Sequence, residues 1–246
     1  MSGAATKRET IDVGRALRFL RQLEKHNERP WFAEHRAVWD EHVKPEWEDT
    51  VAVLLATATT FDQRFAFVDP RSCLFRLARD TRFSNDKTPY KTWVSAWLSP
   101  FGKHGSNPGF YVQICPGRCI VAAGIWDPSK EALHALRRHF ADDDVRAFDR
   151  ILAAKRFAPY LPLETDALRV APRGFPKEHP RRDLVRARRY IVRRVYPDAQ
   201  FAKAGALATY RAAMRDLAPF VAYIERIVST ARVIPSASRD RHDDED

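Results

Sequence analysis

The chain has 246 residues, a formal net charge of +10 and 45% hydrophobic residues, among them fifteen Phe and six Trp. Such a composition provides for a sizeable core and excludes a mostly disordered protein. No apolar stretch approaches the roughly 20 residues of a membrane span, and the charged N-terminus lacks the apolar region of a signal peptide. Three cysteines are typical of a reducing compartment, so we expect a cytoplasmic protein that does not enter a membrane.

The first quarter of the sequence predicts helices. Thr10 or Asp12 is a suitable N-cap for a helix that ends near Lys25, because leucines recur between them at helical spacing. Asn27 is expected to cap a second helix, and Pro45 to begin a third.

From residue 72 the pattern changes to that of strands, rich in β-branched and aromatic residues. The expected strands cover residues 72–78, 92–98, 109–115 and 119–126, with Pro116-Gly117 as the turn of a hairpin. Helices are expected over 127–154, then a proline-rich irregular stretch, a strand over 189–196, and a final helical stretch to about residue 228 with a break or kink near Pro219.

Runs of like elements favour an α+β fold over alternating βαβ units. We therefore predict a single α+β domain over residues 15–230, with an antiparallel or mixed sheet packed by N-terminal and C-terminal helices. Residues 1–14 are expected to form a flexible N-terminus, and residues 231–246 a disordered acidic tail.

The most informative segment is residues 76–91, RLARDTRFSNDKTPYK, in which cations outnumber acids. Arginine presents a planar fork that matches phosphate or carboxylate oxygens, and lysine a mobile point charge. We interpret the segment as a loop that binds an anionic small molecule carrying phosphate or carboxylate. The candidate ligand-binding residues are Arg76, Arg79, Asp80, Arg82, Lys87, Tyr90 and Lys91, with His179 from the proline-rich stretch as a titrating group beside them.

Two alternatives stay open. The arginines of this segment can instead pair with internal carboxylates and form a purely structural network. A second basic run, residues 181–194, holds seven Arg and suits either an edge strand or the extension of a basic groove. Both runs together would fit nucleic acid, although no recognisable nucleic-acid module is present.

The segment resembles the RxxRDxRFxxxKxPY signature of a widespread, mainly bacterial family of unknown function, and no signature position departs from it. Further similarity lies in 27–32 (NERPWF), 124–126 (GIW) and 172–180 (PRGFPKEHP), so the resemblance covers about residues 15–228. It implies that the segment matters but supplies no activity, ligand or catalytic residue.

No phosphate-binding loop, dinucleotide fingerprint or nucleophile elbow occurs in the sequence. Cys115 and Cys119 flank a turn without nearby partner ligands, so no metal site is expected. The sequence names no cofactor. Side chains such as Asp86 and His179 are suitable acids or bases, yet no reaction class follows from them, and whether the protein is an enzyme stays open.

Overall fold

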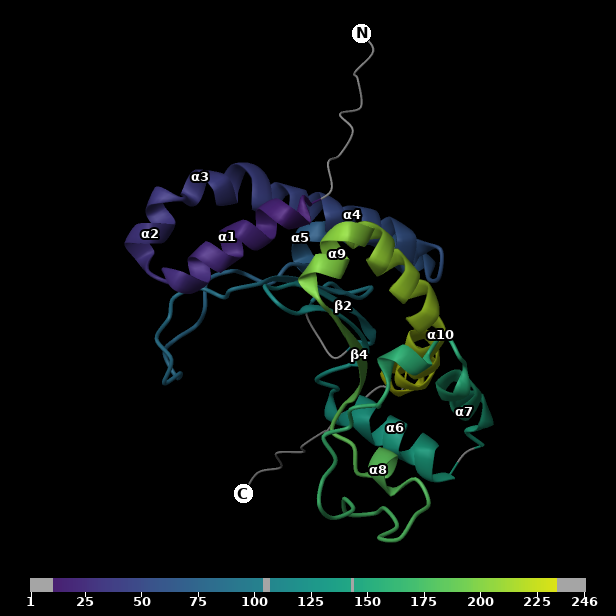
Figure 1. Ribbon diagram of the computed structural model, residues 1–246. Coiled ribbons are helices and arrows are strands. Elements are labelled where there is room, and N and C mark those ends of the chain that lie inside the picture. Colours follow the sequence, from purple (N-terminus) through teal and green to yellow (C-terminus); the bar gives the residue numbers. More distant parts are fainter. Residues whose placement is uncertain (1–10, 104–106, 143, 234–246) are drawn as a thin grey trace, which may run out of the picture.

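Four antiparallel strands form the centre of the protein, and helices from both ends of the chain pack against one face of this sheet (Figure 1). The computed structural model describes residues 11–103, 107–142 and 144–233. The arrangement is the single α+β domain that the order of elements predicts.

The strands are β1 (Val94–Leu98), β2 (Gly109–Ile114), β3 (Cys119–Ile125) and β4 (Tyr190–Tyr196). The longer helices are α1 (Val13–Lys25), α2 (Arg29–Glu34), α4 (Lys44–Thr59), α6 (Lys130–Asp142), α7 (Arg146–Ala153), α9 (Asp198–Ala204) and α10 (Ala206–Val233). The short helical turns are α3 (Arg36–Val38), η1 (Trp39–Val43), η2 (Gln63–Phe67), α5 (Pro70–Cys73), η3 (Ala158–Tyr160) and α8 (Arg182–Val185).

The strands follow the order β1-β2-β3-β4, and every neighbouring pair is antiparallel. Side chains alternate between the two faces, as the period of a strand requires. In β2, Phe110, Val112 and Ile114 enter the main core, whereas Tyr111 and Gln113 lie on the opposite face. The predicted hairpin over 109–126 is confirmed, and β4 is an edge strand as its mixed faces predict.

The core face of the sheet is covered by α1, α4, α6 and α10. Asp12 caps α1, because its side chain accepts a hydrogen bond of 3.0 Å from the backbone N–H of Arg15. Leu20 and Leu23 of this helix are fully buried. Pro219 lies inside α10, which does not end there. No helix in the described part of the chain combines the length and the apolar character that a membrane crossing needs.

Two local predictions are wrong. Residues 72–78 do not form a strand, because Pro70 begins the short helix α5 and only isolated bridges follow, Leu74 to Ala96 and Ala78 to Tyr90. Asn27 does not cap α2, whose N-cap is Glu28, since the Asn27 side chain binds the backbone of Tyr90 instead.

Residues 76–91 form a hairpin, called here the basic hairpin. The backbone N–H of Arg79 donates to the carbonyl of Pro89 at 2.9 Å, and that of Lys91 donates to Leu77 at 2.8 Å. Figure 1 shows the basic hairpin extending away from the sheet, below α2. The flexible N-terminus over 1–14 and the disordered tail over 231–246 fall largely outside the described residues and stay predictions.

Candidate functional site

A cavity of about 560 Å³ opens on the face of the sheet opposite the main core. We call it the sheet-face cavity. Its volume is in the range of sites that hold small organic molecules. All four strands contribute to its floor, through alternating positions such as Trp97, Tyr111, Ala122 and Ile191. It is therefore a product of the sheet's register.

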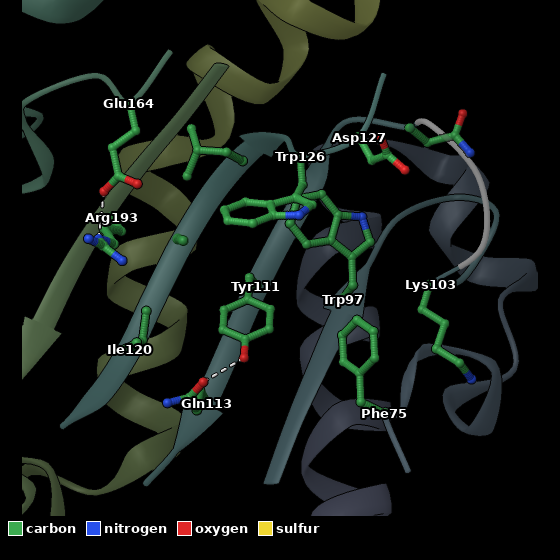
Figure 2. A pocket seen from close by; sticks show the side chains of 13 residues that line it. Phe75, Trp97, Lys103, Tyr111, Gln113, Ile120, Trp126, Asp127, Glu164 and Arg193 are labelled. Atoms are coloured by element: carbon green, nitrogen blue, oxygen red, sulfur yellow. Dashed lines mark hydrogen bonds and ion pairs between the residues drawn. The ribbon is translucent and has the colours of Figure 1, made fainter. Parts of the chain in front are cut away.

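Aromatic rings make up most of the floor. Figure 2 shows Trp97, Tyr111 and Trp126 gathered above the strands, with Phe75 beside them. Trp97 is only 9% exposed, whereas Trp126 is 52% exposed, so one indole is fixed in the floor and the other presents its surface to solvent. The centroid of the Phe75 ring is 6.3 Å from that of Tyr111. Such a surface favours a flat ligand.

Charged side chains at the β4 end of the cavity are already paired. Arg193 forms an ion pair of 2.5 Å with Glu164 (Figure 2). The guanidinium of Arg189 stacks 4.0 Å from the Trp126 ring centroid and also pairs with Asp166 at 3.0 Å. These contacts fix the β4 wall and reduce its attraction for an external anion.

The Phe75 end of the cavity differs, because the cations that gather there form no ion pairs within the described residues. Lys91 places its Nζ 5.4 Å from the centroid of Phe75, and Lys103 lines the cavity itself. The pKa of Lys91 is lowered by burial and, further, by the charges of Arg76, Arg79 and Lys103. Over the described ranges, no carboxylate lies within ion-pair distance of Arg76, Lys91 or Lys103. We call these three residues the cationic group.

The other predicted residues of the basic hairpin bind one another. Arg79 pairs with Asp86 and also donates to the hydroxyl of Thr88. Arg82 forms an ion pair of 2.7 Å with Asp80.

Lys87 donates to the Thr81 carbonyl at 3.0 Å. The structural network that the sequence left open thus accounts for Arg79, Asp80, Arg82 and Lys87, which together stiffen the hairpin.

Tyr90 lies at the base of the basic hairpin, where its ring stacks on Phe32 with centroids 4.3 Å apart. It does not line the sheet-face cavity. His179 is remote from both: it precedes α8, and its Nδ1 accepts a hydrogen bond of 3.0 Å from the backbone N–H of Arg181. Figure 1 shows the segment before α8 and the basic hairpin at separate corners of the molecule.

The second basic run is largely engaged within the protein. Arg181 pairs with Asp149 at 2.7 Å, and Arg188 pairs with Asp166 at 2.9 Å. Arg186 donates to the carbonyls of Arg169 and Lys177. The edge-strand interpretation accounts for this run better than a continuous basic groove.

Of the predicted site residues, the fold therefore brings Lys91 beside the cavity, with Arg76 and the Asp86-paired Arg79 near it. Tyr90 and His179 lie away from the cavity. Sequence reasoning missed Trp97, Tyr111 and Gln113. The signal of Tyr111 and Gln113 was present in the alternation of β2, where these two residues share a face while Phe110 and Val112 share the other. That alternation does not show which of the two faces the helices cover.

A family profile described as "Conserved hypothetical protein (DUF2461)" matches residues 15–223. The match includes the basic hairpin and all four strands. No curated protein and no solved structure matches the chain.

Proposed function

The chain belongs to this family of conserved hypothetical proteins, whose description gives no activity, and we propose from its own side chains that it binds a flat organic anion. The ring system of the ligand lies over the aromatic floor of the sheet-face cavity. Its phosphate or carboxylate is held at the Phe75 end by the cationic group, Arg76, Lys91 and Lys103.

One observation carries this proposal: three mutually repelling cations lie beside the Phe75 end of an aromatic cavity, and no carboxylate of the described residues forms an ion pair with any of them. Gathering like charges costs free energy unless an anion lies among them. Lys91 is intermediate in exposure, so its repulsion from Arg76 and Lys103 is less screened than at a fully exposed site. A bound anion would relieve this repulsion.

The aromatic floor adds the second half of the recognition. Ring stacking contributes about 0.5–1.5 kcal/mol per pair beyond the area buried. Charge-assisted hydrogen bonds contribute about 1.5–3 kcal/mol each. A ligand that carries both a ring and an anionic group should therefore bind much more tightly than either part alone.

Isothermal titration calorimetry with three probes tests the proposal. We expect 2-naphthyl phosphate, which has both parts, to bind at least about tenfold more tightly than 2-naphthol or inorganic phosphate. Lys91→Met and Arg76→Met should each weaken 2-naphthyl phosphate about tenfold and leave 2-naphthol unchanged, because each removes one cation from the anion site.

Lys87→Met is the matched control, because Lys87 lies on the same hairpin but donates to the Thr81 carbonyl and not to the cavity. Its affinity for 2-naphthyl phosphate should stay at the wild-type value. Equal losses in Lys87→Met and Lys91→Met would mean that only the overall charge matters, and the proposed site would be wrong.

Nucleic acid is a weaker choice of ligand for the same surface. Arg193 of β4 is engaged by Glu164, and Arg189, which directly precedes β4, is engaged by Asp166, so neither is available to a phosphate backbone. A backbone ligand would also show an affinity that falls steeply with salt concentration. Binding of single-stranded RNA or DNA with such a slope, and no binding of 2-naphthyl phosphate, would favour it over a small anion.

A further inference from the structure

Gln113 is a polar side chain in an apolar position, and its surroundings set which part of it faces a ligand. It lies in the middle of β2 and lines the sheet-face cavity, yet it is only 5% exposed. Its neighbour across the strands is Ile120 on one side and Ser95 on the other. A buried carboxamide costs free energy unless its donors and acceptors are satisfied.

Tyr111 satisfies one half of this carboxamide. The Tyr111 hydroxyl donates to Gln113 Oε1 at 2.6 Å (Figure 2). Burial raises the pKa of Tyr111, so the phenol keeps its proton and acts as the donor at neutral pH. Because Oε1 accepts from Tyr111, the Nε2 group points away from the phenol and presents its two N–H donors.

These donors have no hydrogen-bond partner among the side chains and backbone groups that the structure describes. Their neighbours on the floor, Ile120 and Ala122, offer no acceptor from their side chains, and the Ser95 hydroxyl across the strand is engaged with the Tyr111 hydroxyl. The cavity thus has an aromatic floor, a cationic end, and a pair of neutral donors that are held in a fixed orientation and accessible from the cavity. A flat hydrocarbon ring would leave these donors unsatisfied, whereas a ring with a carbonyl oxygen or an acceptor nitrogen would not.

We propose that Gln113 is a specificity-determining residue which selects ligands whose flat ring carries a hydrogen-bond acceptor, so that the ligand class is a heterocyclic phosphate or carboxylate. This inference rests on the proposed function, because it concerns the ring of the ligand that the cationic group binds. Tyr111 acts through Gln113 as a positioning residue, since its hydroxyl fixes which end of the carboxamide faces the cavity.

Calorimetry with a matched pair of probes tests the inference. 4-Methylumbelliferyl phosphate and 2-naphthyl phosphate have similar bicyclic rings and the same anionic group, but only the former has a ring carbonyl. The wild-type protein should bind 4-methylumbelliferyl phosphate about tenfold more tightly, which corresponds to about 1.4 kcal/mol. Gln113→Leu should bring the ratio of the two affinities close to one while 2-naphthyl phosphate binds as before.

Tyr111→Phe gives a second readout, because it keeps the ring on the floor and removes the bond that orients Gln113. We expect it to reduce the preference for the carbonyl probe and to leave the affinity for 2-naphthyl phosphate unchanged. Gln113→Glu should weaken both probes, since it adds a negative charge and removes the donors.

The outcomes separate the two proposals. If wild-type protein binds both probes equally, Gln113 does not select the ring and this inference fails, while the proposed function stands. If neither probe binds, both proposals fail. A preference for the carbonyl probe that survives in Gln113→Leu would show that another group reads the ring, and would also overturn the role given to Gln113.

Discussion

The carboxamide of Asn27 binds both backbone groups of Tyr90, 63 residues further along the chain. Its Nδ2 donates to the Tyr90 carbonyl at 2.9 Å, and its Oδ1 accepts from the Tyr90 N–H at 3.0 Å. The Tyr90 ring stacks on Phe32 of α2 beside this contact. Two segments that look unrelated in the sequence, 27–32 and 76–91, are thus one structural unit at the base of the basic hairpin.

Replacing Asn27 by Ala should destabilise the protein by about 2 kcal/mol, because two partly buried hydrogen bonds are lost and the Tyr90 backbone groups keep no partner from this side chain. Urea denaturation measures the loss. Asn85→Ala is the matched control, since Asn85 is exposed on the same hairpin, and it should change stability by less than about 0.5 kcal/mol. Similar values for the two variants would contradict the role assigned to Asn27.

The basic hairpin should lose stability in acid, because the ionised carboxylate of Asp86 holds part of it together. The backbone N–H of Thr88, the guanidinium of Arg79 and the Thr88 hydroxyl lower the pKa of Asp86 from 3.8 to about 2. Because the folded pKa is below the unfolded one, the ionised carboxylate stabilises the hairpin above about pH 4 and this contribution is lost as the pH falls towards 2.

A carbon-detected NMR titration of the Asp86 carboxyl should therefore have its midpoint near pH 2. Hydrogen exchange at the Thr88 amide, which donates to Asp86 at 2.9 Å, should accelerate over the same pH range. In Asp86→Asn the exchange should be fast at neutral pH and independent of this titration. A midpoint at the ordinary value of 3.8 would show that the contacts of Asp86 are not formed in solution.

The fold could be predicted from the sequence wherever the local pattern and the tertiary environment favour the same structure. The β2–β3 hairpin has apolar residues on one face of each strand and Pro116-Gly117 at the turn, so both signals indicate the same structure. At residues 72–78 they disagree. The segment has strand-forming residues, but Asp69 caps a helical turn at Pro70, and only Leu74 and Ala78 find a bridging partner.

The candidate site was accessible only in part, because charge can be counted in a sequence but pairing cannot. Arg79 and Arg82 look like ligand donors until the hairpin turns Asp86 and Asp80 towards them. Arg76 and Lys91 look the same in the sequence and keep no such partner within the described residues. The aromatic floor was missed because the sequence does not show which face of the sheet α10 covers and which face is left for the cavity.

Gly124 should be the least replaceable glycine of the sheet. Its φ is +128°, and a Cβ at this position would lie 1.9 Å from the carbonyl oxygen of Tyr190 in the neighbouring strand. Backbone cannot yield as a flexible side chain does, so Gly124→Ala should cost more than about 3 kcal/mol or prevent folding. Gly117 separates the cost of a positive φ from the cost of a steric clash, because its φ is +73° and nothing lies within 4 Å of its Cβ position. Gly117→Ala should cost only about 1 kcal/mol, and equal losses in thermal denaturation would contradict the clash.

Tyr210 offers a substitution that should stabilise the protein. The side chain is fully buried among Trp47 and Phe201, with ring centroids 6.2 and 5.0 Å away, and its hydroxyl has no hydrogen-bond partner in the structure described. Burial raises the pKa of Tyr210 well above its usual value, so the group stays neutral and the cost is that of a desolvated hydroxyl.

Removing this oxygen in Tyr210→Phe keeps the ring contacts and should raise the free energy of unfolding by about 1 kcal/mol. Tyr160→Phe is the matched control, because the Tyr160 hydroxyl donates to Asp216 at 3.3 Å and its removal should lower stability by about the same amount. Chemical denaturation of the two variants should therefore give shifts of opposite sign. A loss of stability in Tyr210→Phe would mean that its hydroxyl has a partner in solution, such as a buried water molecule.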